Sequence, residues 1–228
     1  MISTIFAASV VLAAAFGAEP AEGPASESKP DRAQAVIDEV ERKCLDGPVY
    51  MIGRKKAERL AELVRKAKPR RVVECGAALG YSGLWIAREL KAAGKGHLIT
   101  IEISPERAKQ AEAHFRKAGL AKFVTVKVGD ARKLVREVKG PIDFVFIDCD
   151  YGNYLPCLQG VQQRLRPGAT IVADNVGIGA SGMKEYLKTV REKYTSRTEW
   201  FDLDLPWAER DAMEVSVVPK QAAGKSDE

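Results

Sequence analysis

Two carboxylates and an amide stand where apolar runs of this 228-residue sequence end. Asp148 follows the run 142–147, and the pair Asp174-Asn175 follows the run 170–173. One acid after a strand is usually a turn former or a helix cap. Two carboxylates and an amide oxygen from neighbouring strand ends form half of an octahedral oxygen shell. Such a shell suits Mg²⁺, with water or a substrate diol completing it. The histidines and cysteines are not placed to form a transition-metal site.

A glycine loop is the second chemical signal. The run Val72-Val73 predicts a buried strand that ends at Glu74, and Gly76 and Gly80 frame a loop before an apolar helix that begins at Tyr81-Ser82. Glycine lacks Cβ, so such a loop turns tightly and lies close to a ligand. A strand, a loop and a helix start in this order are typical of the nucleotide-binding half of a doubly wound sheet. The glycine spacing alone is equally compatible with a plain tight turn.

The neighbouring acids indicate which nucleotide would bind. A dinucleotide site has the spacing G-x-G-x-x-G, whereas this loop has G-x-x-x-G with Glu74 just before it. A carboxylate there would repel a pyrophosphate but would suit the ammonium and sulfonium groups of S-adenosylmethionine (SAM). Glu102 follows the next apolar run, 97–101, at the position where acids of nucleotide-binding folds accept from ribose hydroxyls. We therefore predict a SAM site, and both features disfavour a nicotinamide-dependent oxidoreductase.

A scaffold of alternating strands and helices must position these residues. Periodicity and turn signals predict strands that begin near Val72 and then cover 97–101, 124–128, 142–147, 170–173, 198–203 and 213–218. Helices are predicted over 31–45, in the basic segment 54–71, from Tyr81 onward, over 104–119 with Ser104 as N-cap, from Ala131 to Val138, over 154–165, and over 181–193 with Ser181 as N-cap. Pro167-Gly168 are expected to form a turn, and 204–211 a loop. The prediction is an α/β fold with a Rossmann-like seven-stranded sheet. That sheet is mostly parallel with an antiparallel last strand, and helices cover both faces.

The ends of the chain differ in composition from its middle. Residues 1–18 hold no charged side chain and resemble a signal peptide or a membrane anchor, so we expect export or anchoring. The protein would otherwise be cytoplasmic, and export would raise the question of a SAM supply, since SAM is made in the cytosol. Residues 19–30 predict a disordered linker, residues 31–219 one folded domain that holds the SAM site, and residues 220–228 a flexible tail.

Composition limits the partners. The net charge of +5 is modest, and the basic segment 54–71 has no interleaved aromatic residues. A solvated helix face is therefore favoured over a nucleic-acid surface, and membrane contact is expected only through the N-terminal segment. The four cysteines show no C-x-x-C spacing, which disfavours a zinc site. Disulfides and the oligomeric state stay open.

From about Tyr50 to Val218 the chain resembles catechol O-methyltransferase and its relatives, the metal-dependent small-molecule O-methyltransferases. The glycine motif is shared by many methyltransferases, whereas Asp148 combined with Asp174-Asn175 is specific to the metal-dependent group. The motifs that carry the resemblance are Met51-Ile52-Gly53-Arg54-Lys55-Lys56, the stretch Glu74–Ser82, Ile101-Glu102-Ile103, Asp148-Cys149-Asp150, Asn153-Tyr154-Leu155-Pro156 and Ala173-Asp174-Asn175.

The resemblance implies that the predicted sheet is a Rossmann-like seven-stranded SAM methyltransferase sheet and that residues 31–219 form a SAM-dependent methyltransferase domain. It also implies a role for each of these motifs. Asp148, Asp174 and Asn175 would hold Mg²⁺, and Asp148, Asn175 and Tyr151 are the expected catalytic residues. Contacts with SAM are expected from Ile52, Glu74, Gly76, Ser82, Glu102, Ile103, Asp130, Ala131 and Asp148.

The chain departs from the family pattern in two places. The family carries a general-base lysine three residues after the metal aspartate, and this chain has Tyr151 there. The family's glutamate on the late loop has no clear match, although Asp204 and Glu209 are nearby candidates, and Pro206 and Trp207 would wall the substrate.

Our interpretation is a SAM-dependent O-methyltransferase that methylates a hydroxyl of a catechol-like small molecule with Mg²⁺ assistance. Its partner would be a small catechol or phenol. The alternative is a non-catalytic or weakly active SAM-binding protein that kept the pocket and lost the general-base lysine at Tyr151.

Overall fold

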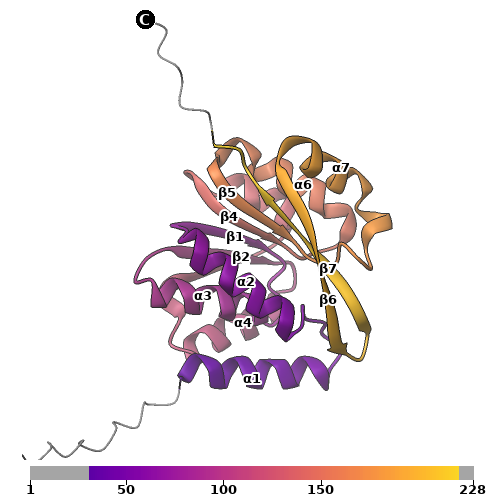
Figure 1. Ribbon diagram of the computed structural model, residues 1–228. Helices are drawn as coiled ribbons and strands as arrows, with labels where there is room; N and C mark the ends of the chain where they lie inside the picture. Colours follow the sequence, from indigo (N-terminus) through magenta and orange to yellow (C-terminus); the bar gives the residue numbers. More distant parts are fainter. Residues whose placement is uncertain (1–30, 221–228) are drawn as a thin grey trace, which may run out of the picture.

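A seven-stranded sheet forms the centre of the computed structural model, which describes residues 31–220 (Figure 1). The strands are ordered β3-β2-β1-β4-β5-β7-β6. Strands β1 to β5 run parallel, and β7 is antiparallel to both of its neighbours. The predicted α/β sheet, mostly parallel with an antiparallel last strand, is thus confirmed. The strands are β1 (Arg71–Cys75), β2 (His97–Glu102), β3 (Val124–Val128), β4 (Ile142–Ile147), β5 (Leu165–Ala173), β6 (Thr195–Leu205) and β7 (Ala208–Val217).

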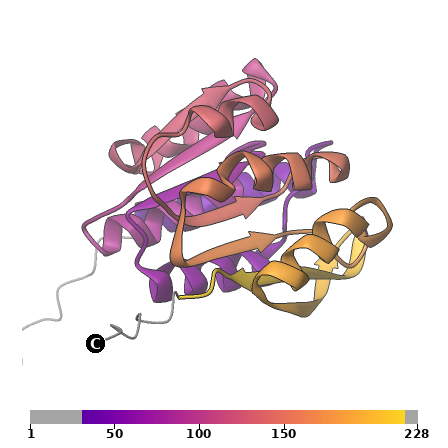
Figure 2. The same cartoon turned by 90° about the horizontal axis from the view of Figure 1, so that it is seen from above.

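Helices cover both faces of this sheet (Figure 2). Residues of α1 to α4 share one hydrophobic core with the sheet, and residues of α5 to α7 belong mainly to a second core on the opposite face. The α-helices are α1 (Arg32–Leu45), α2 (Arg54–Ala67), α3 (Tyr81–Ala92), α4 (Pro105–Lys117), α5 (Ala131–Leu134), α6 (Tyr154–Val161) and α7 (Lys184–Lys193).

Alternate residues of the central strands supply the two cores. Phe144 and Phe146 of β4 pack on the side of α1 to α4, whereas Val145 and Ile147 pack on the side of α5 to α7. All four side chains are fully buried. A parallel strand that helices cover on both faces exposes neither set of its side chains, which is why residues 144–147 are all apolar.

Side-chain caps begin two helices, and the cap at Ser104 was predicted. The side chain of Ser104 accepts from the N–H of Arg107 at the start of α4, and Pro105 occupies the first turn, where its missing N–H costs nothing. Asp31 caps α1 in the same way by accepting from the N–H of Ala33. The Ser104 cap fixes the start of α4 directly after the end of β2.

The prediction of a loop over residues 204–211 was wrong. Strands β6 and β7 instead meet in a tight hairpin in which Leu205 pairs with Ala208, leaving only Pro206-Trp207 in the turn. A shift of register between Asp202 and Leu205 lets the two strands continue to the turn. The local sequence suggested a loop because proline and charged residues are frequent in loops, but cross-strand pairing outweighs that preference.

Three other boundaries also differ from the prediction. Helix α7 begins at Lys184 without a side-chain cap, and Ser181 belongs to a short 3₁₀ turn before it. Helix α6 ends at Val161 and continues as a 3₁₀ turn to residue 164. Strand β5 begins at Leu165 and includes Pro167-Gly168, with a register shift opposite the start of β4. A proline is tolerated there because it lies at an irregular strand end.

The predictions for the chain ends concern residues that lie outside the described range. These are the leader 1–18, the linker 19–30 and the tail beyond residue 220. Within residues 31–220, none of the helices combines the length and the apolar character needed to cross a membrane.

Candidate functional site

A cavity of about 620 Å³ opens beside the carboxyl ends of β1, β2, β4 and β5. Parallel strands bring these ends to one edge of the sheet, where ligands bind in open α/β folds. The cavity unites the glycine loop, the acid after β2 and the polar cluster after β4 and β5. The predicted site residues that line it are Ile52, Gly76, Ser82, Glu102, Ile103, Asp130, Ala131, Asp148, Tyr151, Asp174, Asn175 and Trp207.

The glycine loop adopts a backbone shape that few residues tolerate. Gly76 has a φ of +100°, and a Cβ at this position would lie 1.8 Å from the carbonyl oxygen of Asp148. Ala78 has a φ of +46°, and its N–H donates to Oε2 of Glu102 at 2.8 Å. This hydrogen bond offsets the backbone strain at Ala78. The loop after β1 and the acid after β2 therefore hold each other in place.

Glu102 ends β2 with its side chain only 4% exposed. Besides the N–H of Ala78, its carboxylate accepts from the N–H of Ser104 at 3.1 Å and from Nε of Arg107 at 2.8 Å. Arg107 also lines the cavity and was missed by the sequence analysis. Charge-assisted hydrogen bonds of this kind fix a carboxylate in one orientation. Glu102 is thereby held at the cavity wall as an oriented acceptor.

Glu74 is the exception among the predicted SAM contacts, because it does not line the cavity. Its side chain is fully buried, and Oε1 accepts from the hydroxyl of Ser82 at 2.6 Å. Its Oε2 has no hydrogen-bond partner within residues 31–220. Burial, partly offset by the hydrogen bond from Ser82, raises the pKa of Glu74 to about 7. Glu74 therefore stabilises the first turn of α3 through its hydrogen bond with Ser82 and does not face the cavity.

Asp148 and Asn175 meet across the ends of β4 and β5. Nδ2 of Asn175 donates to Oδ1 of Asp148 at 2.9 Å. Asn175 has a φ of +59°, a left-handed conformation that asparagine adopts more readily than most residues. Burial and the nearby negative charge of Asp174 raise the pKa of Asp148 well above its ordinary value. Such strain and such a shift are typical of functional sites.

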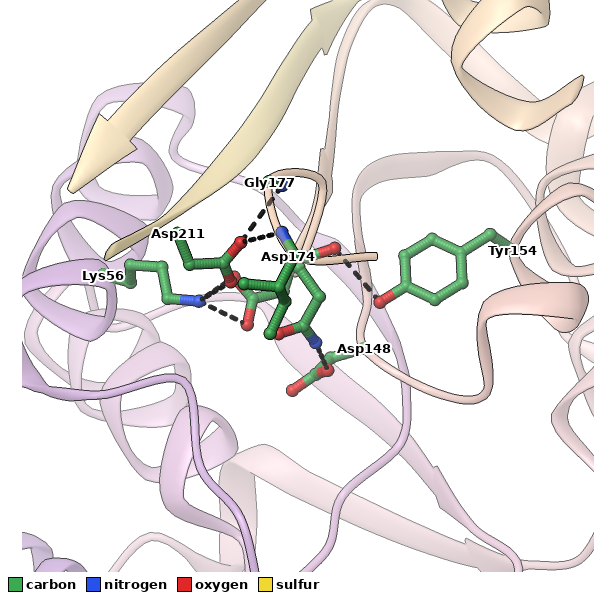
Figure 3. A network of polar contacts seen from close by, with 8 residues as sticks. Lys56, Asp148, Tyr154, Asp174, Gly177 and Asp211 are labelled. Carbon is green, nitrogen blue, oxygen red and sulfur yellow. Dashed lines mark hydrogen bonds and ion pairs between the residues drawn. The ribbon is translucent and has the colours of Figure 1, made fainter. Parts of the chain in front are cut away.

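Lys56 is the unexpected member of this cluster (Figure 3). Its ammonium donates to both carboxylate oxygens of Asp174, at 2.7 and 2.9 Å, and to Oδ2 of Asp211 at 2.8 Å. All three side chains are at most 2% exposed. Burial opposes the charged lysine, but the carboxylates of Asp174 and Asp211 outweigh it and raise the pKa of Lys56. The ammonium is therefore permanently charged.

Lys56 and Asp211 were not predicted as site residues, although each leaves a local signal in the sequence. Lys56 falls in the basic segment 54–71, yet it lies one helical turn before the buried Leu60 and so shares its apolar face. Asp211 alternates with the buried Met213 and Val215 of β7, so the strand pattern places it inward. A charged residue on a buried face needs a partner, and here the two residues are each other's partners.

The predicted metal ligands can be compared with the chemistry of their site. Within residues 31–220, the histidine, cysteine, aspartate and glutamate side chains form no group of three or more that could hold a metal ion. The predicted shell differs in kind, because its third member is the amide oxygen of Asn175. Asp148, Asp174 and Asn175 all line the cavity and offer only oxygen donors, as Mg²⁺ prefers. Each oxygen of Asp174 keeps a lone pair beyond its bond to Lys56. These residues fit the ion.

Aromatic and apolar side chains form the outer wall of the cavity. Tyr50 and Trp207 pack edge to face, with ring centroids 5.2 Å apart, and both line the cavity together with Tyr151 and Ile178. The predicted wall residue Trp207 is therefore in place. Pro206 is exposed in the hairpin turn and is not one of the lining residues.

The two candidates for the family's late-loop glutamate do not reach the cavity. The side chain of Asp204 is 94% exposed and pairs with Lys55, and Glu209 is exposed on β7. Neither belongs to the cavity lining. The acid of this hairpin that joins the cluster of Lys56 and Asp174 is Asp211, which was not predicted as a site residue.

Comparisons with known proteins agree with this geometry. Residues 73–176 match a family model described as a methyltransferase domain. A catechol O-methyltransferase from Niastella koreensis is 35% identical over 133 residues, which cover 57% of this chain and 59% of the relative. A catechol O-methyltransferase from Sus scrofa is 33% identical over 147 residues, covering 61% of this chain and 77% of the relative. This chain spans about three fifths of the length of the first curated relatives that it matches.

Solved structures show the same fold. The crystal structure of cofactor-bound Rv0187 from MTB superposes with a TM-score of 0.70 at 27% identity, covering 86% of this chain and 93% of that chain. The similarity therefore extends over most of this chain.

Proposed function

Because the chain belongs to the catechol O-methyltransferase-like family of SAM-dependent O-methyltransferases, we propose that it transfers the methyl group of SAM to a hydroxyl of a catechol-like small molecule. One observation carries the proposal. A single cavity joins an oriented carboxylate and glycine loop on one side to a cluster of oxygen ligands on the other. A cofactor and an acceptor bound there would meet beside Asp148.

The cofactor half of the cavity offers the groups that SAM requires. The fixed carboxylate of Glu102 would accept from the ribose hydroxyls, and the backbone at Gly76 would lie against the methionine part. Ile52, Ser82, Ile103, Asp130 and Ala131 would complete the SAM site, because they line the same space. Glu74 would act indirectly, by holding Ser82 at the helix start.

The acceptor half offers a hard-cation site beside an aromatic wall. Asp148, Asp174 and Asn175 would hold Mg²⁺, which when bound lowers the pKa of a coordinated hydroxyl and orients it. Tyr50 and Trp207 would pack against an aromatic ring and shield it from water. Holding the acceptor in line with the methyl group accounts for most of the rate that such a site can supply.

Tyr151 lines the same half, and its chemistry differs from that of a lysine base. Burial and then the negative charges of Asp211, Asp148 and Asp174 raise the pKa of Tyr151 above its ordinary value. The phenol therefore stays protonated at neutral pH and can donate a hydrogen bond to the acceptor. This property is also what supports the second candidate function, a SAM-binding protein with little or no turnover.

A substrate panel with SAM separates the two candidates. We expect methylation of at least one catechol with Mg²⁺, and no methylation when a chelator is in excess. Asp174→Asn should mimic the chelator, whereas the exposed control Asp202→Asn should behave as the wild type. SAM binding, followed by calorimetry, should survive both changes. Turnover that persists in excess chelator would show that these acids are structural, and SAM binding without turnover of any diol would favour the second candidate.

We further propose that residues 1–18 direct the chain to the cell envelope, as their uncharged apolar composition indicates. Cell fractionation tests this proposal. Full-length protein found free in the cytosol would refute it and would remove the question of how an exported enzyme obtains SAM.

A further inference from the structure

Asp211 uses its two carboxylate oxygens for two different parts of the site (Figure 3). Oδ1 accepts from the backbone N–H groups of Gly177 at 3.1 Å and of Ile178 at 3.0 Å. Oδ2 accepts from the ammonium of Lys56 at 2.8 Å. The residue is 1% exposed and lies on β7. One buried side chain therefore contacts both the turn after β5 and helix α2.

Each of these contacts leads to a different side of the cavity. The ammonium of Lys56 also donates to both carboxylate oxygens of Asp174, which is one of the predicted metal ligands. The turn at Gly177 carries Ile178, which lines the acceptor side of the cavity. The turn lies close against Asp211, because a Cβ on Gly177 would stand 2.7 Å from Oδ1. The cation ligand and the acceptor wall are thus linked through one carboxylate.

The charges explain why the link is needed. Asp174 and Asp211 place two carboxylates around the single ammonium of Lys56, so the ammonium divides its hydrogen bonds between them. If Asp211 were neutral, Lys56 would interact with Asp174 alone and would compete more strongly for its lone pairs. The net negative charge of the cluster would also fall. Both effects oppose binding of a divalent cation.

We propose that Asp211 is a positioning residue that couples the cation ligand Asp174 to the acceptor wall at Gly177 and Ile178. The proposal rests on the proposed function, since it assumes that the cavity holds a divalent cation and an acceptor. Asp211 itself would contact neither the cation nor the acceptor. Lys56 transmits the effect of Asp211 to Asp174, and the two backbone N–H groups transmit it to the turn.

Two substitutions and one control test this role. Asp211→Asn keeps the size of the side chain but has one acceptor oxygen, so it can serve the turn or Lys56 but not both. Asp211→Ala has no side-chain acceptor for either the turn or Lys56. The control is Glu214→Gln on the same strand, because Glu214 is equally buried but faces α7, where Nε of Arg191 donates to it at 2.8 Å. It reports the cost of neutralising a buried carboxylate that pairs with a half-exposed arginine and does not line the cavity.

The first measurement is calorimetric titration of Mg²⁺ into protein saturated with S-adenosylhomocysteine. Both Asp211 variants should bind Mg²⁺ roughly 10–100-fold more weakly than the wild type, the range for lost outer contacts of metal ligands. Glu214→Gln should bind as the wild type. The affinity for SAM should stay within about twofold in every variant, because Asp211 contacts no residue of the cofactor half. Where a catechol is turned over, Asp211→Ala should also raise the acceptor KM.

The second measurement is amide hydrogen exchange at residues 177 and 178. In the wild type and in Glu214→Gln, added Mg²⁺ should slow exchange at these two amides. In Asp211→Asn the slowing should disappear, because either orientation of the amide breaks one half of the link. This comparison stands even if Asp211→Ala does not fold.

Equal Mg²⁺ affinity in the wild type and Asp211→Asn would overturn the proposal, as would Mg²⁺-dependent slowing that survives in Asp211→Asn. A wild type that binds no Mg²⁺ overturns it as well. These outcomes do not depend on turnover. A wild type that methylates catechols while Asp211→Asn keeps its Mg²⁺ affinity removes the positioning role and leaves the proposed function intact.

Discussion

The ring of Tyr151 stands edge-on to the ring of Tyr154, with centroids 6.4 Å apart and planes at 61°. The hydroxyl of Tyr154 in turn donates to the backbone oxygen of Asp174 at 3.2 Å. Tyr151 therefore packs against a side chain that is itself held by a hydrogen bond, beside the acidic cluster. Tyr151 is 38% exposed and lines the cavity. This placement lets it contact an acceptor, while burial and then the surrounding negative charge raise the pKa of Tyr151 and keep its proton in place.

Replacing Tyr151 by lysine should restore general-base catalysis. The wild type is expected to methylate a catechol slowly at pH 7 and faster toward alkaline pH, where the substrate ionises without help. Tyr151→Lys should raise the rate at neutral pH by up to roughly 10²-fold, the usual contribution of a positioned base. The measurement is kcat against pH for both forms with one catechol, with Tyr151→Phe as the control that lacks any titratable group. A wild type that is already fast and flat around neutrality, and that lysine slows, would assign Tyr151 to acceptor recognition.

Glu102→Ala should weaken SAM binding by about 1.5–3 kcal/mol, the scale of lost hydrogen bonds to a charged group. The carboxylate is buried and oriented by Ser104 and Arg107, so its loss removes both the acceptor and the anchor of the glycine loop. Calorimetry measures the affinity, and the exposed Glu106→Ala on the first turn of α4 is the control. Equal SAM affinity in Glu102→Ala and the wild type would remove the ribose role.

Glu74 should make the folded protein less stable as pH rises. Its pKa is raised to about 7 from 4.5 in the unfolded chain, so the folded state holds the proton more tightly between these values. Stability is therefore lost as pH rises through this window, by about 2–3 kcal/mol between pH 5 and pH 8. Glu74→Gln should lack this contribution. Denaturant unfolding of both proteins at several pH values gives the difference, and a difference that does not change with pH would contradict the shift.

Gly76→Ala should destabilise the fold strongly. The new methyl would meet the carbonyl oxygen of Asp148 at 1.8 Å and would also require a left-handed alanine, which together cost at least ~3 kcal/mol. The matched control is Gly94→Ala, at a φ of +64° with open space around it. That change should cost only the backbone strain, about 1–2 kcal/mol. Thermal unfolding of the two variants compares them, and similar losses would mean that the loop yields at Gly76.

The predictable parts of the site are those whose position can be inferred from the local sequence of a single segment. An apolar run that stops at Glu102, Asp148 or Asp174 marks both the end of a buried strand and the residue that it delivers to the sheet edge. Since parallel strands end on one side, three such stops imply one cleft. The Ser104-Pro105 start of α4 was equally local, because a cap needs only its own first turn.

The parts that were missed depend on partners far apart in the chain. Lys56 and Asp211 are 155 residues apart, and neither shows its role until α2 and β7 are packed against β5. Ser181 looked like a helix cap, but helix α7 begins three residues later without any side-chain cap. Tertiary packing decides such cases, so a charged residue on an apolar face is a better guide to a hidden partner than the charge of its segment.

The position of β7 also sets the order in which the protein can be completed during translation. β7 is the last described strand, yet it lies between β5 and β6, so β6 has no neighbour to join until residues 208–217 leave the ribosome. A nascent chain that stops before Ala208 already contains Lys56 and Asp174 but lacks Asp211. The cluster of Lys56, Asp174 and Asp211 is therefore among the last parts of the molecule to form, and a growing chain passes through a stage in which β5 is an open sheet edge.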